Sequence, residues 1–146
     1  MKNNYLIEYN PEDYESEKAS NSYLMSMISI VVGLPLPIVN LIATLIFFLG
    51  NRSESYFIRW HCTQALLSQL LMFFVNSSMF WWTISVVFTD EKATLKYFIA
   101  LTLVFIYNLL EFIITIFAAI RTRKGEHVHW FLFGDLANIL CKNRTK

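Results

Sequence analysis

The chain has 146 residues, of which 55% are hydrophobic and 16% are charged, and its net charge at neutral pH is +1. Because about a quarter of the residues in a soluble domain are usually charged, this composition favours a membrane protein over a soluble helical bundle. The nearly neutral charge argues against nucleic-acid binding, and the four scattered glycines leave no phosphate-binding loop. We therefore expect no enzymatic activity and no bound cofactor.

The chain begins with a polar tail and continues into a long apolar region. Residues 1–22 are predicted to be a solvated acidic tail, with Glu8, Glu12, Asp13, Glu15 and Glu17. Residues 19–51 contain no Asp, Glu, Lys or Arg, and we predict a first transmembrane helix over residues 23–49. Pro35 and Pro37 remove backbone donors, so this helix is expected to be long and kinked. The alternative is that the region turns back at these prolines.

Two more apolar stretches follow. Residues 60–89 contain no charged side chain, which predicts a second transmembrane helix over residues 62–88. The next stretch is interrupted only by Glu111 and predicts a third over residues 95–120. Short linkers make neighbouring helices antiparallel. The sequence therefore predicts an all-α polytopic membrane bundle of three transmembrane helices, in one domain over residues 23–120.

Lysine and arginine residues predict the orientation, because they concentrate in cytoplasmic loops. With three crossings, the loop at residues 51–59 and the C-terminus share a side. Eight of the 12 Lys and Arg residues fall on that side, namely Arg52, Arg59, Arg121, Arg123, Lys124, Lys142, Arg144 and Lys146. We predict a bacterial inner-membrane protein with its N-terminus outside and its C-terminus in the cytoplasm. A turn back at the prolines would place the N-terminus inside.

The C-terminal segment, residues 121–146, is basic and predicts a short amphipathic helix. Residues 127–141 read HVHWFLFGDLANILC, in which apolar side chains recur at helical spacing. The run is short for a crossing, so we predict an interfacial helix with Trp130 at the headgroup level and the basic end facing anionic lipid. A cytoplasmic cap packed on the bundle is an equal alternative.

Polar side chains recur inside the predicted transmembrane helices, at Asn40, Gln69, Asn76, Asn108 and Glu111. We predict that they form a polar seam between helices. A carboxylate near mid-bilayer, such as that of Glu111, costs several kcal/mol unless it is paired or protonated. We interpret the seam as interhelical hydrogen bonding. The alternative is an ion or proton step, or a polar groove for a substrate.

Histidines and cysteines fall near the same predicted membrane interface, at His61, Cys62, His127, His129 and Cys141. These are residue types that bind zinc, but their spacing matches no zinc signature, so we predict no metal site. A reducing cytoplasm argues against a disulfide between the two cysteines.

Two stretches resemble a known family. Residues 53–66, SESYFIRWHCTQAL, resemble the phrase S-P-F-V-R-F-H-A-K-Q-A-L, and residues 118–126, AAIRTRKGE, resemble A-x-I-K-A-x-x-G-E. Both phrases are typical of the Tic-twenty-like family. It comprises a membrane subunit of the chloroplast inner-envelope protein translocon and small bacterial relatives of unknown function. Tyr56, Thr63 and Phe131 depart from the family, which has Pro, Lys and Pro there.

The resemblance implies a non-enzymatic helical subunit or scaffold of a larger membrane complex, with a link to protein translocation. It singles out a motif at the inner interface, Arg59, His61, Gln64, Gly125 and Glu126. Arg59 can reach lipid phosphates, and we predict that Glu126 pairs with Arg59 or His61. Alternative functions are a small oligomeric channel or transporter that uses the polar seam, and a membrane-acting effector or accessory factor. The expected partners are lipids, other membrane subunits or further copies of the chain.

Overall fold

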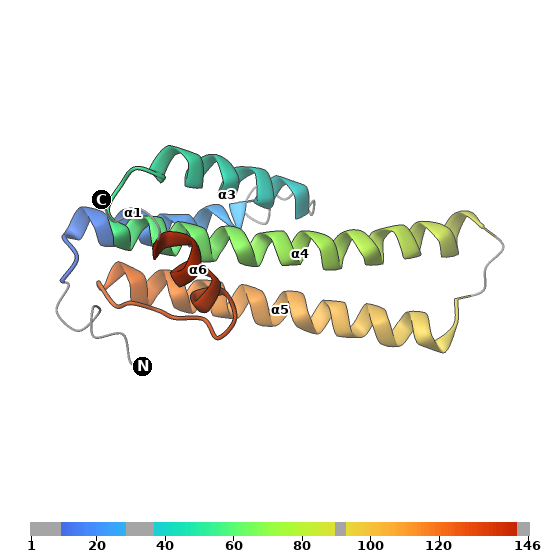
Figure 1. The fold of residues 1–146 in the computed structure, drawn as a ribbon. Helices are drawn as coiled ribbons and strands as arrows, with labels where there is room; N and C mark the ends of the chain where they lie inside the picture. Colours follow the sequence, from blue (N-terminus) through green and yellow to red (C-terminus); the bar gives the residue numbers. More distant parts are fainter. Residues whose placement is uncertain (1–9, 29–36, 90–92, 143–146) are drawn as a thin grey trace.

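The computed structural model describes residues 10–28, 37–89 and 93–142, and the regular elements in these ranges are helices. In chain order they are α1 (Asp13–Met25), α3 (Pro37–Asn51), α4 (Tyr56–Phe88), α5 (Leu95–Arg123) and α6 (Phe133–Lys142). Figure 1 shows α4 and α5 as a long antiparallel hairpin, with the other helices gathered around one end. The predicted all-α class is confirmed. Pro35, Arg144 and Lys146, which entered the sequence predictions, lie outside the described residues.

Among the described residues, α4 and α5 are the two helices long and apolar enough to cross a membrane. At 1.5 Å per residue, the 33 residues of α4 extend over about 50 Å and the 29 residues of α5 over about 44 Å. Both helices are longer than a hydrocarbon core of about 30 Å, so part of each one extends past it. α4 begins six residues before the predicted start at residue 62, directly after its N-cap residue Ser55.

The first apolar region does not form the single kinked transmembrane helix predicted over residues 23–49. α1 ends at Met25, and α3 begins at Pro37. A proline fits the first turn of a helix because its missing backbone donor is not needed there. With 15 residues, α3 extends over only about 22 Å, too short to cross the hydrocarbon core. The predicted set of three transmembrane helices is therefore not confirmed.

α1 and α3 instead lie along the same half of α4, as Figure 1 shows. α1 runs in the same direction as α4, as two contacts show. Lys18 pairs at 2.8 Å with Glu54, just before α4, and Tyr23, further along α1, accepts from Gln64 within α4 at 2.8 Å. α3 runs in the opposite direction to both. This arrangement agrees with the alternative in which the first apolar region turns back.

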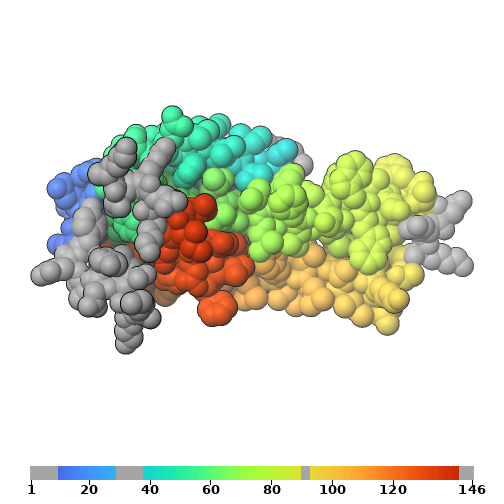
Figure 2. Space-filling view, viewed as in Figure 1, coloured from blue at the N-terminus to red at the C-terminus, as the bar shows by residue number. Residues whose placement is uncertain are grey.

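The hairpin has two unlike parts, which we name here. At the basal end, where α4 begins and α5 ends, α1, α3 and α6 cover the hairpin (Figures 1 and 2). A core of small and aromatic side chains holds this end together, namely Tyr23, Ala65, Ala118, Ala119 and Trp130. The small residues allow close approach of the helices. Of the other described helices, only the start of α3 reaches the distal half, residues 76–88 of α4 and 95–108 of α5 (Figure 2).

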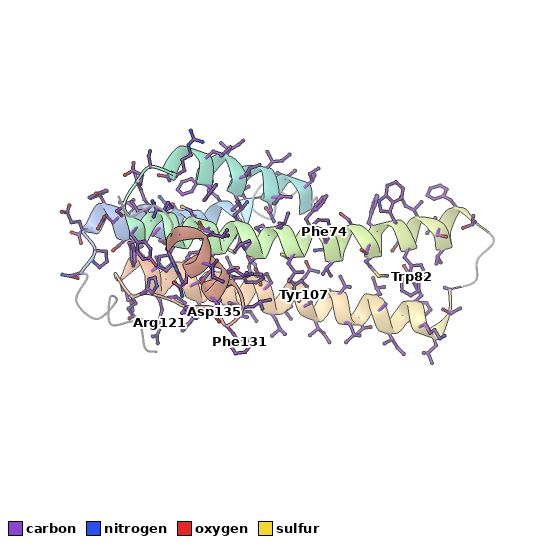
Figure 3. The ribbon with its side chains drawn as sticks, viewed as in Figure 1. Phe74, Trp82, Tyr107, Arg121, Phe131 and Asp135 are labelled. Atoms are coloured by element: carbon purple, nitrogen blue, oxygen red, sulfur yellow. The ribbon has the colours of Figure 1, made fainter. Side chains whose placement is uncertain are left out.

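α6 packs on the basal part of α4 with its small side chains inward. Ala137 and Cys141 are buried against Trp60. The outward face is apolar, with Leu136, Ile139 and Leu140 exposed. Phe131, just before the helix, is 94% exposed and projects away from the bundle in Figure 3. The amphipathic helix is thus present, but Trp130 is buried in the core and does not lie at an exposed headgroup level.

Candidate functional site

The basal end contains a hydrogen-bond hub at Gln64, which is fully buried. Its Nε2 donates to the Tyr23 hydroxyl at 2.8 Å and to the Val128 carbonyl at 3.1 Å. Its Oε1 accepts from the backbone N–H of Trp130 at 3.1 Å. One amide side chain therefore joins α1, α4 and the segment that leads into α6.

His61 extends this hub by one turn of α4. The Tyr23 hydroxyl and His61 Nδ1 are 2.7 Å apart. That hydroxyl accepts from Gln64, and it can donate its own hydrogen to Nδ1 when the imidazole proton lies on Nε2. His61 Nε2 is buried without a partner among the described residues. Burial also raises the pKa of Tyr23, which keeps the hydroxyl protonated.

The preceding residues of α4 bind α6. Trp60 Nε1 donates to Asn138 Oδ1 at 2.7 Å, and Arg59 Nη2 donates to the Cys141 carbonyl at 3.1 Å. The Arg59 bond places a cation at the C-terminal end of α6, where the helix dipole favours positive charge. Residues 59–64 therefore form a junction that connects α1, α6 and the segment between α5 and α6.

Gly125 and Glu126 belong to the end of α5 and not to this junction. Gly125 has a φ of 80°, the left-handed conformation that glycine favours just after a helix. Its N–H bonds the Thr122 carbonyl at 3.0 Å. Glu126 Oε2 pairs with Arg121 Nη1 at 2.8 Å, and both side chains are about half exposed. The predicted pairing of Glu126 with Arg59 or His61 is therefore wrong, because the tight turn at Gly125 carries Glu126 back over Arg121.

The predicted polar seam is partly assembled in the distal half. Asn76 Nδ2 donates to Asn108 Oδ1 at 3.0 Å, and Asn108 Nδ2 donates to Asn76 Oδ1 at 2.9 Å. Further along the hairpin, the Tyr97 hydroxyl donates to Thr83 Oγ1 at 3.2 Å. Both links tie α4 to α5, and of the two only the Asn76–Asn108 pair joins residues of the predicted seam.

The other seam residues are buried nearer the basal end. Glu111 is 7% exposed and interacts with the Ser68 hydroxyl. Its Oε1 has no hydrogen-bond partner among the described residues. Gln69 Nε2 contacts Met72 Sδ at 3.7 Å, and Asn40 on α3 is buried as well. Among the described residues, the structure therefore joins Asn76 to Asn108 and places Glu111 beside Ser68.

The histidines cluster beside the junction. The ring centroids of His61 and His127 are 5.0 Å apart, and that of His127 is 4.0 Å from Trp60. Burial, and then the neighbouring His129, lower the pKa of His127 to about 4. Within the described ranges no group of three or more His, Cys, Asp or Glu side chains is placed to hold a metal ion. Both cysteines are free and buried.

The sequence analysis did not predict as site residues four residues that lie in the junction or bond to it, namely Tyr23, Trp60, Trp130 and Asn138. Tyr23 and Trp130 were placed at membrane boundaries, as the start of a span and as an interfacial anchor. The signal that could have found them is the same in each case. An aromatic or amide group with a polar atom, near a buried histidine and glutamine, can satisfy their hydrogen bonds.

The fold and the junction are those of a small polytopic helical membrane protein. Two of its described helices are long and apolar enough to cross a membrane, and its basal end holds a buried polar junction. The model of the magnetosome magnetite crystal formation protein family matches residues 19–136. The match covers most of the 146 residues, and the chain belongs to that family. No curated protein and no solved structure matches the chain.

The family match overturns the resemblance to the Tic-twenty-like family, which is a different family. The link to protein translocation rested on that resemblance and is no longer supported. The physical reason lies in the motif itself. Arg59, His61 and Gln64 act in packing, because they join helices at the start of a membrane hairpin. Such a role can recur in unrelated helical membrane proteins.

Proposed function

We propose that this chain is a non-enzymatic integral membrane protein that acts as a helical subunit or scaffold in magnetite crystal formation. Membership of the magnetosome family supports the process. One structural observation carries the scaffold role. The distal half of the hairpin is incomplete by itself, with a groove of about 700 Å³ along α4, α5 and the start of α3. Large apolar side chains such as Phe80, Trp81 and Phe105 line it and are exposed. A surface of this kind is expected to bind lipid or another helix.

The use of the polar side chains also supports a structural role. The amide of Gln64 is engaged with Tyr23, Val128 and Trp130. The amides of Asn76 and Asn108 bond to each other and to backbone carbonyls of their own helices. These groups stabilise the helix arrangement, as expected of a scaffold.

The same proposal includes an orientation with the basal end in the cytoplasm. The distribution of basic residues between the two ends supports this orientation. Among the described side chains, six basic residues lie near the basal end, namely Lys18, Arg52, Arg59, Arg121, Arg123 and Lys124, and Lys96 lies at the distal end. The positive-inside rule then favours a cytoplasmic basal end. Because α1 begins there, the N-terminus would lie inside as well, in place of the predicted outside location.

Cysteine labelling tests this orientation. Ser53 and Thr94 are exposed residues at opposite ends of the hairpin. In sealed right-side-out vesicles, a membrane-impermeant maleimide is expected to label Thr94→Cys, and Ser53→Cys only after detergent is added. The native cysteines are buried, and the unsubstituted chain measures their background labelling. The reverse labelling pattern would overturn the orientation.

Gene deletion tests the function. In a magnetite-forming host, loss of the chain is expected to change crystal size or shape, as measured by electron microscopy, while membrane vesicles remain. The intact gene should restore the crystals. An Asn76→Leu/Asn108→Leu variant, which loses the distal amide pair, should restore them poorly although it reaches the membrane. Unchanged crystals in the deletion strain would contradict the proposal.

One observation favours a second candidate, a small channel or transporter. Glu111 is a buried carboxyl group in a crossing helix, and its Oε1 lacks a partner among the described residues. A group of this kind is a candidate for a proton or cation step. Glu111→Gln tests it in proteoliposomes. Ion flux in the native chain and loss of flux in the variant would support transport, and equal behaviour of the two would exclude a role for protonation.

A further inference from the structure

A second groove lies at the basal end, between α3, α4 and α6. Its volume is about 370 Å³. Its walls are apolar, with Phe48 from α3, Leu66 and Leu67 from α4, and Leu140 from α6. Two arginines, Arg52 and Arg59, also line it. None of the described residues that line it is Asp or Glu, so these residues give the groove apolar walls and two arginines.

Arg59 has hydrogen-bonding capacity left inside this groove. Its Nη2 is held by the Cys141 carbonyl at 3.1 Å. Its Nε is buried and has no partner among the described residues. The acidic residue closest in sequence, Glu54, pairs with Lys18 at 2.8 Å. Because an unsatisfied buried donor is unfavourable, an acceptor from beyond the described residues is expected here.

The position of the groove along the membrane normal indicates which acceptor it meets. A hydrocarbon core of about 30 Å takes up about 20 residues of helix. Counted from the distal end of α4 at Phe88, those residues reach to about Ser68. Arg59 then lies about 13 Å further along the helix, at the level of the headgroups. The leucine walls, at residues 66 and 67, lie where acyl chains begin.

We propose that this groove binds one anionic phospholipid of the basal leaflet. Its phosphate contacts Arg52 and Arg59, since guanidinium groups bind phosphate through paired, charge-assisted hydrogen bonds. The first methylenes of an acyl chain lie against Leu66, Leu67 and Leu140. Guanidinium groups beside the phosphate favour a headgroup with net negative charge over a zwitterionic one. This inference concerns lipid recognition and does not depend on the proposed function.

Native mass spectrometry of the full chain in detergent tests the proposal, with phosphatidylglycerol, phosphatidylcholine or inorganic phosphate added. We expect at least tenfold tighter binding of phosphatidylglycerol than of phosphatidylcholine, and no competition from inorganic phosphate. Arg52→Gln/Arg59→Gln should weaken phosphatidylglycerol binding at least tenfold. The matched control Arg121→Gln/Arg123→Gln removes two arginines from the same end but outside the groove, and should change binding less than threefold.

Because Arg59 also bonds α6, its substitution could disturb folding, and a second variant tests the groove without changing either arginine. Leu67→Trp fills the groove, keeps both arginines and should also weaken phosphatidylglycerol binding at least tenfold. Thermal unfolding in detergent shows which variants remain folded. Equal loss in the groove and control arginine pairs, or undiminished binding by folded Leu67→Trp, would overturn the proposal. Competition by inorganic phosphate, or an absence of headgroup preference, would do the same.

Discussion

The basal end and the distal half are built from the same two helices, but different interactions hold them. At the basal end, α4 and α5 pack with three further helices around fully buried side chains such as Trp60 and Gln64. In the distal half, the hairpin has two described interhelical side-chain links, Asn76 with Asn108 and Tyr97 with Thr83. The comparison shows one end that folds by its own contacts and another that relies on its surroundings.

The difference follows from the solvent. In water, exposed side chains such as Phe80, Trp81 and Phe88 would favour collapse of the distal half. In lipid they need no cover, and a few polar contacts and close packing hold the helices together. The basal end instead buries polar side chains such as Gln64 among several helices, where they need hydrogen-bond partners within the protein.

The largest effect is expected at the basal hub. Gln64→Leu removes three buried hydrogen bonds and leaves the Val128 carbonyl and the Trp130 N–H without a partner. We expect a loss of about 3 kcal/mol in the free energy of unfolding, measured by denaturant titration in detergent micelles. The control is Gln69→Leu, which removes a buried amide whose Nε2 makes only a weak contact with the Met72 sulfur, and it should cost less. Equal losses would contradict the role of the hub.

The second effect is a pH dependence confined to the basal end. His127 has its pKa lowered to about 4 by burial and then by His129, whereas an unfolded histidine titrates near pH 6.5. Between these values the unfolded chain binds more protons, so stability falls as the pH is lowered from about 6.5 to about 4. We expect a loss of about 1–2 kcal/mol after solvent screening of a partly buried ring.

His127→Phe keeps an aromatic ring beside Trp60 and removes the titrating group. Its stability should therefore vary less than that of the native chain over this pH window. At pH 7.5, where histidine is neutral in both states, the native chain should show none of this loss. An identical acid dependence in the two proteins would show that other groups cause it.

The third effect tests the distal half. A double-mutant cycle with Asn76→Leu and Asn108→Leu should give a coupling energy of about 0.6 kcal/mol, with an upper range of about 1.7 kcal/mol. Each single change leaves one amide without its partner in lipid, whereas the double change removes both, so the double variant should be less destabilised than the sum predicts. Additive effects would mean that the amide pair contributes no net stability.

Much of this contrast was predictable from the sequence. The uncharged stretches predicted α4 and α5, because a bilayer imposes length and apolarity. Asn76 and Asn108 could be expected to pair, since polar groups in lipid bond to one another. The two spans, the short C-terminal helix and the structural use of the amides are therefore readable from local pattern.

The basal end was harder to predict, because its contacts join residues far apart in the chain. Tyr23 meets Gln64, and Trp60 meets Asn138, across 41 and 78 positions. No local spacing encodes such pairs. The apolar region around Pro37 was predicted to cross the membrane once because its total length fitted a bilayer. In the structure, α1 packs on α4 and α5, and α3 packs on α4. The motif around Arg59 suggested the wrong family because packing needs alone can produce it.

The smallest effect separates a true basal contact from a predicted one. Arg121 and Glu126 form a half-exposed pair at 2.8 Å, and such pairs contribute about 0.2–1 kcal/mol. Exchanging their charges, Arg121→Glu with Glu126→Arg, should restore most of the small loss caused by either change alone. Arg59→Glu with Glu126→Arg should show no such rescue, because Arg59 bonds the Cys141 carbonyl at the end of α6. Unfolding titrations of these variants at low salt, where surface pairs are strongest, would measure both couplings, and rescue in the Arg59 pair would restore the contact that the structure replaces.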